Sequence, residues 1–120
     1  MKYLLMITVD PAIAAAVPLR LRRAVEAGHV EFRGPLRETG ELVGFATLAD
    51  PANSATVAVR DGVTLVTEGP CGTPGGYLAG LYLVDCESAD RARELAALIP
   101  EAALAAVEVR PVMTESGMEM

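Results

Sequence analysis

The sequence has no tryptophan, a single histidine and two cysteines among its 120 residues. Aromatic residues make up 4% of the chain while 52% of it is hydrophobic, so the core must consist mainly of Ala, Leu and Val. A chain of this length fits one domain and buries enough surface to fold without a disulfide or a metal. We expect a single domain over residues 1–120, with reduced thiols at Cys71 and Cys86, although spacing alone leaves a disulfide open.

Positive charge is also scarce, because ten Lys and Arg stand against sixteen Asp and Glu, a net charge of −6. Such a surface repels phosphate backbones, and the chain lacks basic stripes interleaved with aromatic residues. We therefore predict no nucleic-acid partner. One histidine and two distant cysteines do not have the spacing of metal ligands, so we also predict no metal site and no cofactor.

Long apolar runs are absent too, since no segment reaches the roughly 18 continuous residues of a membrane span. The apolar start of the chain superficially resembles a signal peptide. Asp10-Pro11 interrupts it after about seven residues, which is the lower limit for the hydrophobic part of such a peptide. We interpret residues 2–9 as a strand, and we expect a cytoplasmic protein without a membrane partner.

Two segments, residues 2–9 and 77–85, are apolar on both faces, which is typical of strands at the centre of a sheet. Asp61-Gly62 separates two β-rich runs, and this dipeptide predicts a hairpin with a type I′ turn. Ser88 is a suitable N-cap for the second of two helices. The expected elements are strands over 2–9, 42–48, 56–60, 63–67, 77–85 and 107–110, with helices over 18–39 and 89–99.

The first helix carries the candidate catalytic residue, His29, at the edge of its apolar stripe, about 80° from Leu21 on a helical wheel. An imidazole suits acid/base chemistry because its charge changes near neutral pH, but a half-buried structural histidine fits the same pattern. Gly34-Pro35 is expected to kink or break the helix. The opposite face is expected in solvent and carries Arg22, Arg23, Glu26, Arg33 and Arg37.

The order of elements, β-α-β, a hairpin, then β-α-β, predicts the fold class. It is the split βαβ plan of an α+β protein, so we expect ferredoxin-like topology with an inserted β-hairpin. Two helices cover only one side of such a sheet, and a second copy of the same sheet would cover the other. We therefore predict a homodimer that pairs through its sheet faces.

Residues 68–76 form a loop dense in Gly and Pro. Phosphate-binding loops of the Walker type need a Lys and lead into a helix, whereas this loop has no Lys and leads into a strand. We interpret the loop as a tight turn with glycines at positive φ.

Several segments together carry a family resemblance: Val57–Gly62, Leu65–Pro70, Gly80–Asp85, Ile99-Pro100 and Val107–Val112. In this order and spacing they resemble the YCII-related proteins of the DGPF type. The similarity covers residues 56–112 well and the opening residues 1–6, and it is loose over residues 11–50. It implies a dimeric α+β barrel, with a pocket between the first helix and the sheet that the glycine-rich loop roofs.

Relatives of this kind are small bacterial proteins, mostly of unassigned activity, and some accompany extracytoplasmic-function sigma factors. Certain members are proposed to use a His–Asp dyad, and one branch dechlorinates a hydroxyquinol-like compound. His29 is similar in placement to the dyad histidine. The dyad Asp lies in an Asp-Pro-Tyr segment, where this chain has Ile99-Pro100-Glu101, so the resemblance implies that the Asp is missing. The namesake tetrapeptide is Glu68-Gly69-Pro70-Cys71 here, which keeps an acid.

Three functions follow as hypotheses. The first is a non-catalytic or regulatory homodimer that binds a small molecule in a pocket with few polar groups. The alternative is an enzyme that uses His29 as acid or base on a small (hydroxy)aromatic or related metabolite, with Glu68 replacing the missing Asp. A further alternative, by family analogy, is an interaction module linked to a sigma factor. The candidate ligand-binding residues are Tyr3, His29, Glu68, Gly69, Pro70 and Tyr82.

Overall fold

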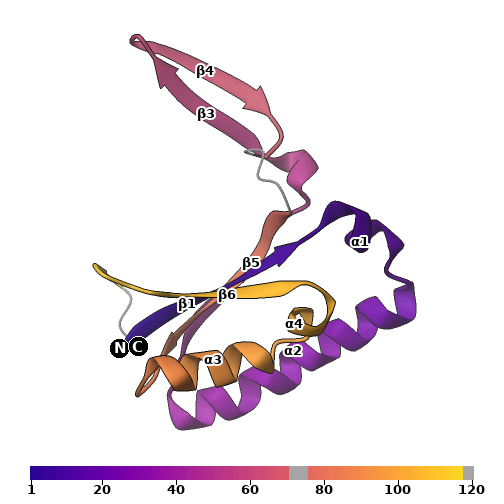
Figure 1. The fold of residues 1–120 in the computed structure, drawn as a ribbon, viewed down its shortest axis with the longest axis vertical. Coiled ribbons are helices and arrows are strands. Elements are labelled where there is room, and N and C mark those ends of the chain that lie inside the picture. The colour runs from indigo at the N-terminus through magenta and orange to yellow at the C-terminus, as the bar shows by residue number, and fades with distance from the viewer. Residues whose placement is uncertain (71–75, 118–120) are drawn as a thin grey trace.

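The computed structural model describes residues 1–70 and 76–117. Figure 1 shows helices gathered on one side of a sheet and a separate hairpin that projects away from them. The elements are β1 (Lys2–Val9), α1 (Pro11–Ala16), α2 (Leu19–Thr39), β2 (Leu42–Thr47), a 3-10 turn (Pro51–Asn53), β3 (Ala55–Arg60), β4 (Val63–Glu68), β5 (Tyr77–Asp85), α3 (Ala89–Ala97), α4 (Glu101–Leu104) and β6 (Ala106–Pro111).

The main sheet has four strands in the order β2-β5-β1-β6. Each neighbouring pair is antiparallel, and β1 and β5 pair along their whole lengths, from Lys2 opposite Asp85 to Val9 opposite Tyr77. The two strands predicted to be central are therefore central. The α+β class is confirmed, and the strand order is compatible with a ferredoxin-like split βαβ fold.

The core lies between one face of this sheet and helices α2, α3 and α4 (Figure 1). Alternate residues of β1 point into it, and Leu5 is fully buried. Ser88 caps α3 as predicted, because its Oγ accepts the N–H of Arg91 at 3.1 Å. Helices α2 and α3, with the turn that follows α3, bury an apolar set against the strands: Phe32, Leu36, Ala92, Leu95, Ala96 and Ile99.

Helix α2 continues through Pro35, so the expectation that Gly34-Pro35 could break it is wrong. A proline inside a helix removes one backbone hydrogen bond and crowds the preceding turn. Pro35 itself is exposed, whereas Phe32 and Leu36 on either side of it are buried in the core. We attribute the continuity of the helix to the burial of this apolar stripe, which outweighs the lost hydrogen bond.

Strands β3 and β4 form a two-stranded sheet of their own, which we call the arm (residues 55–68). Asp61 and Gly62 both have positive φ, at 51° and 76°, which confirms the predicted type I′ turn. The chain has a radius of gyration of 16.0 Å, whereas a compact chain of this length has roughly 14 Å. The arm thus extends from the body and leaves apolar side chains such as Val57 and Val66 exposed (Figure 1).

Two further expectations bear on the surroundings of the protein. No helix in residues 1–70 and 76–117 is long and apolar enough to cross a membrane. Cys86 is a free, buried thiol, and burial raises its pKa above the ordinary value. Cys71 lies outside the described residues, as does most of the glycine-rich loop predicted to roof the pocket.

Candidate functional site

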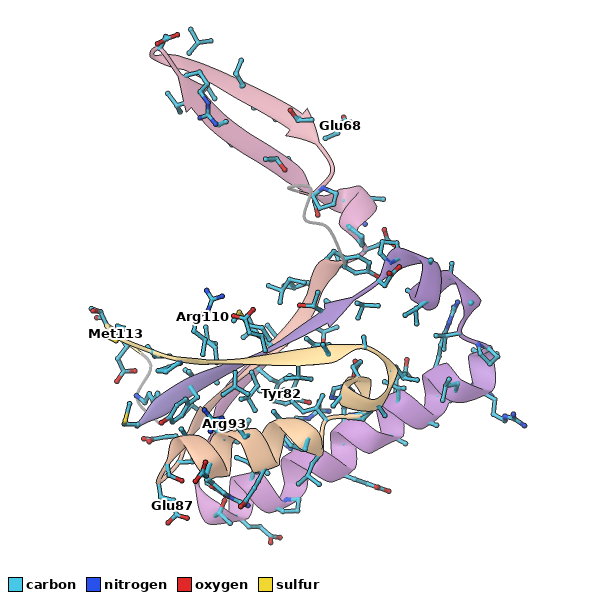
Figure 2. The ribbon with its side chains drawn as sticks, in the orientation of Figure 1. Glu68, Tyr82, Glu87, Arg93, Arg110 and Met113 are labelled. Carbon is cyan, nitrogen blue, oxygen red and sulfur yellow. The ribbon has the colours of Figure 1, made fainter. Side chains whose placement is uncertain are left out.

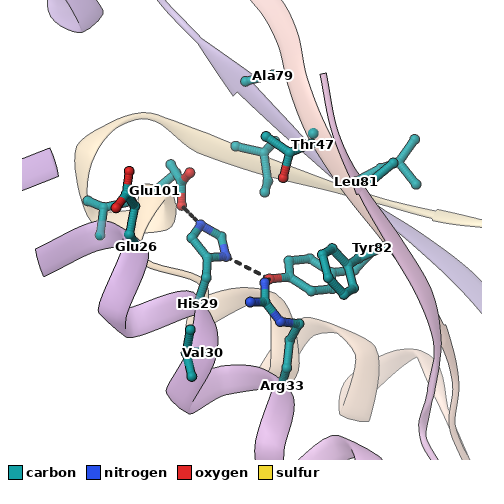
Figure 3. Close-up of a pocket in the computed structure, with 14 residues that line it drawn as sticks. Glu26, His29, Val30, Arg33, Thr47, Ala79, Leu81, Tyr82 and Glu101 are labelled. Atoms are coloured by element: carbon teal, nitrogen blue, oxygen red, sulfur yellow. Dashed lines mark hydrogen bonds and ion pairs between the residues drawn. The ribbon is translucent and has the colours of Figure 1, made fainter. Parts of the chain in front are cut away.

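A cavity of about 440 Å³ lies between helix α2 and strands β2 and β5 (Figure 3). Strand β1 contributes Ile7 to its wall, and the start of α4 contributes Glu101. The cavity is thus assembled from five elements that come from separate parts of the chain. Its polar and aromatic lining residues are Glu26, His29, Arg33, Phe45, Thr47, Tyr82 and Glu101.

His29 is hydrogen-bonded through both ring nitrogens inside this cavity. Nε2 lies 2.6 Å from Oε1 of Glu101, and Nδ1 lies 2.7 Å from the hydroxyl of Tyr82. The His29 and Glu101 side chains are only 16% and 18% exposed, so water screens their interaction weakly. A carboxylate 72 positions away along the chain therefore orients the only imidazole.

The hydrogen bonds around His29 determine its tautomer and which group donates in each bond. An ionised carboxylate only accepts hydrogen bonds, so in the neutral ring Nε2–H donates to Glu101 and Nδ1 is the acceptor. Tyr82 then donates its O–H to Nδ1, and its oxygen accepts an N–H from Nη1 of Arg33 at 3.3 Å. Burial raises the pKa of Tyr82, and the charge of Arg33 opposes this shift only in part, so the phenol stays protonated at neutral pH.

A close approach of two backbone segments brings Glu101 to His29. Gly28 of α2 faces Pro100, and a Cβ built on Gly28 would lie 2.7 Å from Cγ of that proline. Glycine is the residue that permits this contact, because it has no side chain to keep the segments apart. His29 and Glu101 directly follow these two residues, so the contact positions both partners of the pair.

Arg33 does not extend into solvent as expected from the helical wheel. Its guanidinium lies 4.2 Å from the ring centroid of Phe45, and its Nη1 donates to Tyr82. The Tyr82 ring also contacts Phe32 edge-on, with centroids 4.9 Å apart. The expectation failed because a helical wheel places only the Cα, while a long side chain at the edge of the stripe can turn inward over an aromatic ring.

The structure brings together two of the candidate site residues, His29 and Tyr82. Tyr3 is buried in the core, where its hydroxyl lies 3.8 Å from Sδ of Met1, and it does not line the cavity. Glu68, Gly69 and Pro70 lie at the base of the arm, where the Gly69 N–H bonds to the carbonyl of Ser54 at 2.8 Å. Figure 2 shows Glu68 well apart from Tyr82 within one chain. The predicted contacts of these four residues with a ligand stay predictions.

Sequence reasoning missed the roles of Glu101, Arg33 and Phe45. One signal for Glu101 was present, because Ile99-Pro100-Glu101 carries an acid two positions beyond the place of the dyad Asp. A glutamate also has a longer side chain than an aspartate, which helps it to reach the imidazole from a different backbone position. No sequence signal singled out Phe45, whose side chain contacts Tyr82 with ring centroids 5.7 Å apart.

A second cavity, of about 280 Å³, adjoins the first and shares Val25, Glu26 and Glu101 with it. Helix α1 and the residue that follows it line this cavity with the apolar side chains of Ile13 and Val17. Helix α1 was not expected from the sequence; Asp10-Pro11 caps and begins it, since Oδ1 of Asp10 accepts the N–H of Ala12 at 2.8 Å. In the described part of the chain, no three His, Cys, Asp or Glu side chains gather closely enough to hold a metal ion.

Comparison with known proteins shows the family of this chain. The chain is similar to an uncharacterized protein of Rhizobium meliloti (strain 1021), with 35% identity over 77 residues. That match covers 62% of this chain and 62% of the relative, so less than two thirds of the relative's length is spanned. The sequence pattern of the YCII-related domain matches residues 1–116, nearly the entire chain. The protein therefore belongs to the family of YCII-related domains.

Proposed function

We propose that this protein binds a small molecule in the cavity between α2 and the sheet. It removes a proton from that molecule and returns one to the product, with His29 as the acid/base group. The observation that carries the proposal is the hydrogen bond of 2.6 Å between Nε2 of His29 and Glu101. A carboxylate behind an imidazole sets its tautomer and stabilises the imidazolium that forms when the ring accepts a proton. Glu101 thus supplies the acid that the family resemblance had implied to be missing.

The proton reaches His29 through Tyr82. In the starting state the phenol donates its O–H to Nδ1, which lies 2.7 Å away. When a bound molecule gives a proton to the Tyr82 oxygen, the original phenolic proton moves to Nδ1, and His29 becomes an imidazolium paired with Glu101. Tyr82 is then the catalytic residue that touches the substrate, and His29 holds the proton behind it. The reverse sequence returns a proton to the product.

A second candidate function is binding without catalysis, as a regulatory or storage protein for the same molecule. The observation that favours it is that both nitrogens of His29 already have partners within the chain, as in a structural histidine. In that case the Glu101–His29–Tyr82 chain holds α2, α4 and β5 together, and the cavity serves only as a receptor. The two functions differ in whether the bound molecule is turned over.

The experiment is a thermal-shift screen of the wild type against phenols, quinols, small acids and other metabolites, followed by turnover assays on each compound that stabilises the protein. A ligand at about one hundred times its dissociation constant adds roughly 2.7 kcal/mol, an easily measured shift for this size. We expect His29→Ala and Glu101→Gln to reduce turnover by about 10²–10⁴-fold, the usual contribution of a positioned acid/base group.

Glu31→Gln is the matched control, because it removes the same charge from an exposed position of the same helix, and Glu31 is not among the residues that line the cavity. Its turnover should stay close to that of the wild type. Binding that all three variants retain, without turnover in any of them or in the wild type, would favour the receptor function. Turnover unchanged in His29→Ala would reject the acid/base proposal.

We also propose that the protein is a homodimer in the cytoplasm, paired as a dimeric barrel through the sheet face opposite the helices. Residues of β1 and β5 that alternate with the core residues, such as Leu4, Met6 and Leu81, lie on this face, and no described helix covers it (Figure 1). A continuous apolar sheet face of this kind is stable when a partner covers it. A second copy of the same face is the simplest complement.

Light scattering after gel filtration tests the dimer. The wild type should have twice the chain mass of 12.6 kDa, and Met6→Glu should be monomeric, because a charge at the centre of the interface would lose its hydration. Leu98→Glu is the control: Leu98 is 65% exposed and follows α3 on the other side of the sheet. A monomeric wild type, or a dimeric Met6→Glu, would contradict the sheet-face dimer.

A further inference from the structure

Arg33 is a cation in the wall of the cavity, and the described part of the chain gives it no anionic partner. No ion pair joins it to any described residue, whereas Arg91 on the neighbouring helix α3 pairs with Glu41 at 2.9 Å and with Glu94 at 3.2 Å. Its Nε is sealed from solvent and has no hydrogen-bond acceptor within the described structure. Arg33 as a whole is partly buried, and a partly desolvated charge without a counter-charge costs free energy that an anionic ligand would offset.

Nη2 is the nitrogen of Arg33 that can donate to a ligand in the cavity. Nη1 gives one N–H to Tyr82, at 3.3 Å. For Nη2 the described residues offer no acceptor, and unlike Nε it is not sealed from solvent. The guanidinium therefore presents unused donors beside the hydroxyl that we propose to carry protons to His29.

The charges around the cavity are arranged by sign. Figure 3 shows Glu26 and Glu101 on one side of His29 and Arg33 with Tyr82 on the other. Glu101 is already bonded to His29, and Glu26 is exposed on α2. An anion is thus attracted to the Arg33 end of the cavity and repelled from the opposite end.

Phe45 holds the guanidinium in place, since Arg33 lies 4.2 Å from the centroid of its ring. Stacking on an aromatic ring restricts a long side chain that would otherwise lose entropy on binding a ligand. A planar guanidinium that is fixed in this way matches the plane and the two oxygens of a carboxylate better than an ammonium would.

We propose that the cavity binds a small organic carboxylate, whose oxygens accept hydrogen bonds from Arg33 next to the Tyr82 hydroxyl. This inference rests on the proposed function, because it names the ligand class of the same cavity. Arg33 determines specificity: it selects an anion and sets the molecule's reactive part toward Tyr82 and His29. If Arg33 only tied α2 to β2 and β5, its substitution would leave the preference for a charged ligand unchanged.

The test compares two probes of the same planar shape that differ in charge, benzoate and benzamide, with acetate and acetamide as a smaller pair. Binding is measured by titration while the side-chain N–H signals of arginine and the ring signals of His29 are followed by NMR. We expect a carboxylate to bind the wild type at least tenfold more tightly than its amide and to move the Arg33 signals, as the loss of a charged hydrogen bond predicts.

Variants separate binding from folding. Arg33→Gln should abolish the preference for the carboxylate, and Arg33→Lys, which keeps the charge, should retain the preference at lower affinity. Arg23→Gln is the matched control, because it removes the same charge from an exposed position of the same helix, and Arg23 is not among the residues that line the cavity. It should behave as the wild type.

The outcomes distinguish this inference from the proposed function. Equal binding of acid and amide, a preference that survives in Arg33→Gln, or no carboxylate that moves the Arg33 signals would each overturn the carboxylate site. If the acid and the amide bind the wild type equally and neither binds His29→Ala, the ligand still occupies this cavity and only the proposed charge of the ligand is wrong. If carboxylates bind at Arg33 but are never turned over, the inference is supported and the acid/base proposal fails.

Discussion

Gly28 and Pro100 approach so closely that the glycine position has no room for a side chain, since a Cβ there would lie 2.7 Å from Cγ of the proline. The next residue on each side of this contact belongs to the proposed acid/base pair, His29 and Glu101. The packing of Gly28 against the ring of Pro100 therefore sets the distance between the two residues of the pair, although neither Gly28 nor Pro100 takes part in proton transfer. This arrangement leads to the first prediction.

Gly28→Ala should disturb the pair without unfolding the protein. The methyl group must displace Pro100, and with it Glu101, while the better helix propensity of alanine returns about 0.5–1 kcal/mol to stability. Because the chain has one histidine, nitrogen NMR of its ring reports the pair directly. The wild type should show the Nε2–H tautomer, and Gly28→Ala a mixture of tautomers with turnover at least tenfold lower, the order expected for a misplaced catalytic group.

Gly34→Ala is the control for this prediction, because a Cβ at Gly34 meets no atom within 4 Å. Its ring spectrum should match that of the wild type. If Gly28→Ala also kept the pure Nε2–H tautomer, the contact with Pro100 would not position the pair.

Glu41 should make stability depend on acid pH. The hydrogen bond from Arg91 lowers the pKa of Glu41 below its ordinary value of 4.5, although partial desolvation opposes the shift. A carboxyl whose folded pKa is lowered contributes stability above its unfolded pKa, and that contribution is lost as the pH falls through the folded value. The difference in melting temperature between the wild type and Glu41→Gln should therefore be largest near neutral pH and shrink below about pH 4.5.

Glu87→Gln is the reference for this measurement, because the Glu87 side chain is exposed at the edge of the molecule (Figure 2). It loses the same charge and should show only a small difference at every pH. A Glu41→Gln difference that stays constant from neutral to acid pH would show that the pair with Arg91 does not couple to the titration.

Leu95 should be the most sensitive position of helix α3. Its side chain is fully buried, so Leu95→Ala removes apolar contacts and leaves a cavity, and we expect a loss of about 2–5 kcal/mol in the free energy of unfolding. Leu98→Ala makes the same chemical change three residues later, where the side chain is 65% exposed, and should cost less than about 0.5 kcal/mol. Urea denaturation measures both, and similar losses would contradict this placement of the core.

The arm should be dispensable for the fold of the body. Its two strands bond only to each other in the sheet pairing, and its ends meet at the hydrogen bond between Gly69 and Ser54. Replacing residues 55–68 with a short Gly-Ser linker should leave the circular dichroism of the helices and the His29 tautomer unchanged. It should also leave the proposed sheet-face dimer intact, so a monomeric armless chain would place the dimer contact on the arm instead.

Local signals were enough to predict most of the elements. Preferences that act within a few residues predict the Asp61-Gly62 turn, the Ser88 cap and the strands at 2–9 and 77–85 that are apolar on both faces. These preferences do not depend on which other segments the residues contact. Pro35 was one exception, because a local rule for breaking a helix competed with burial of Phe32 and Leu36 on either side of it.

The sequence by itself thus determined the α+β class, the hairpin turn and the position of His29 on its helix. Only the tertiary structure decided that Glu101 pairs with His29 and that Arg33 turns inward over Phe45. The physical reason is that backbone preferences act over a few residues, whereas a pair separated by 72 positions forms only when packed segments meet. Here that meeting depends on the space left by Gly28 for Pro100.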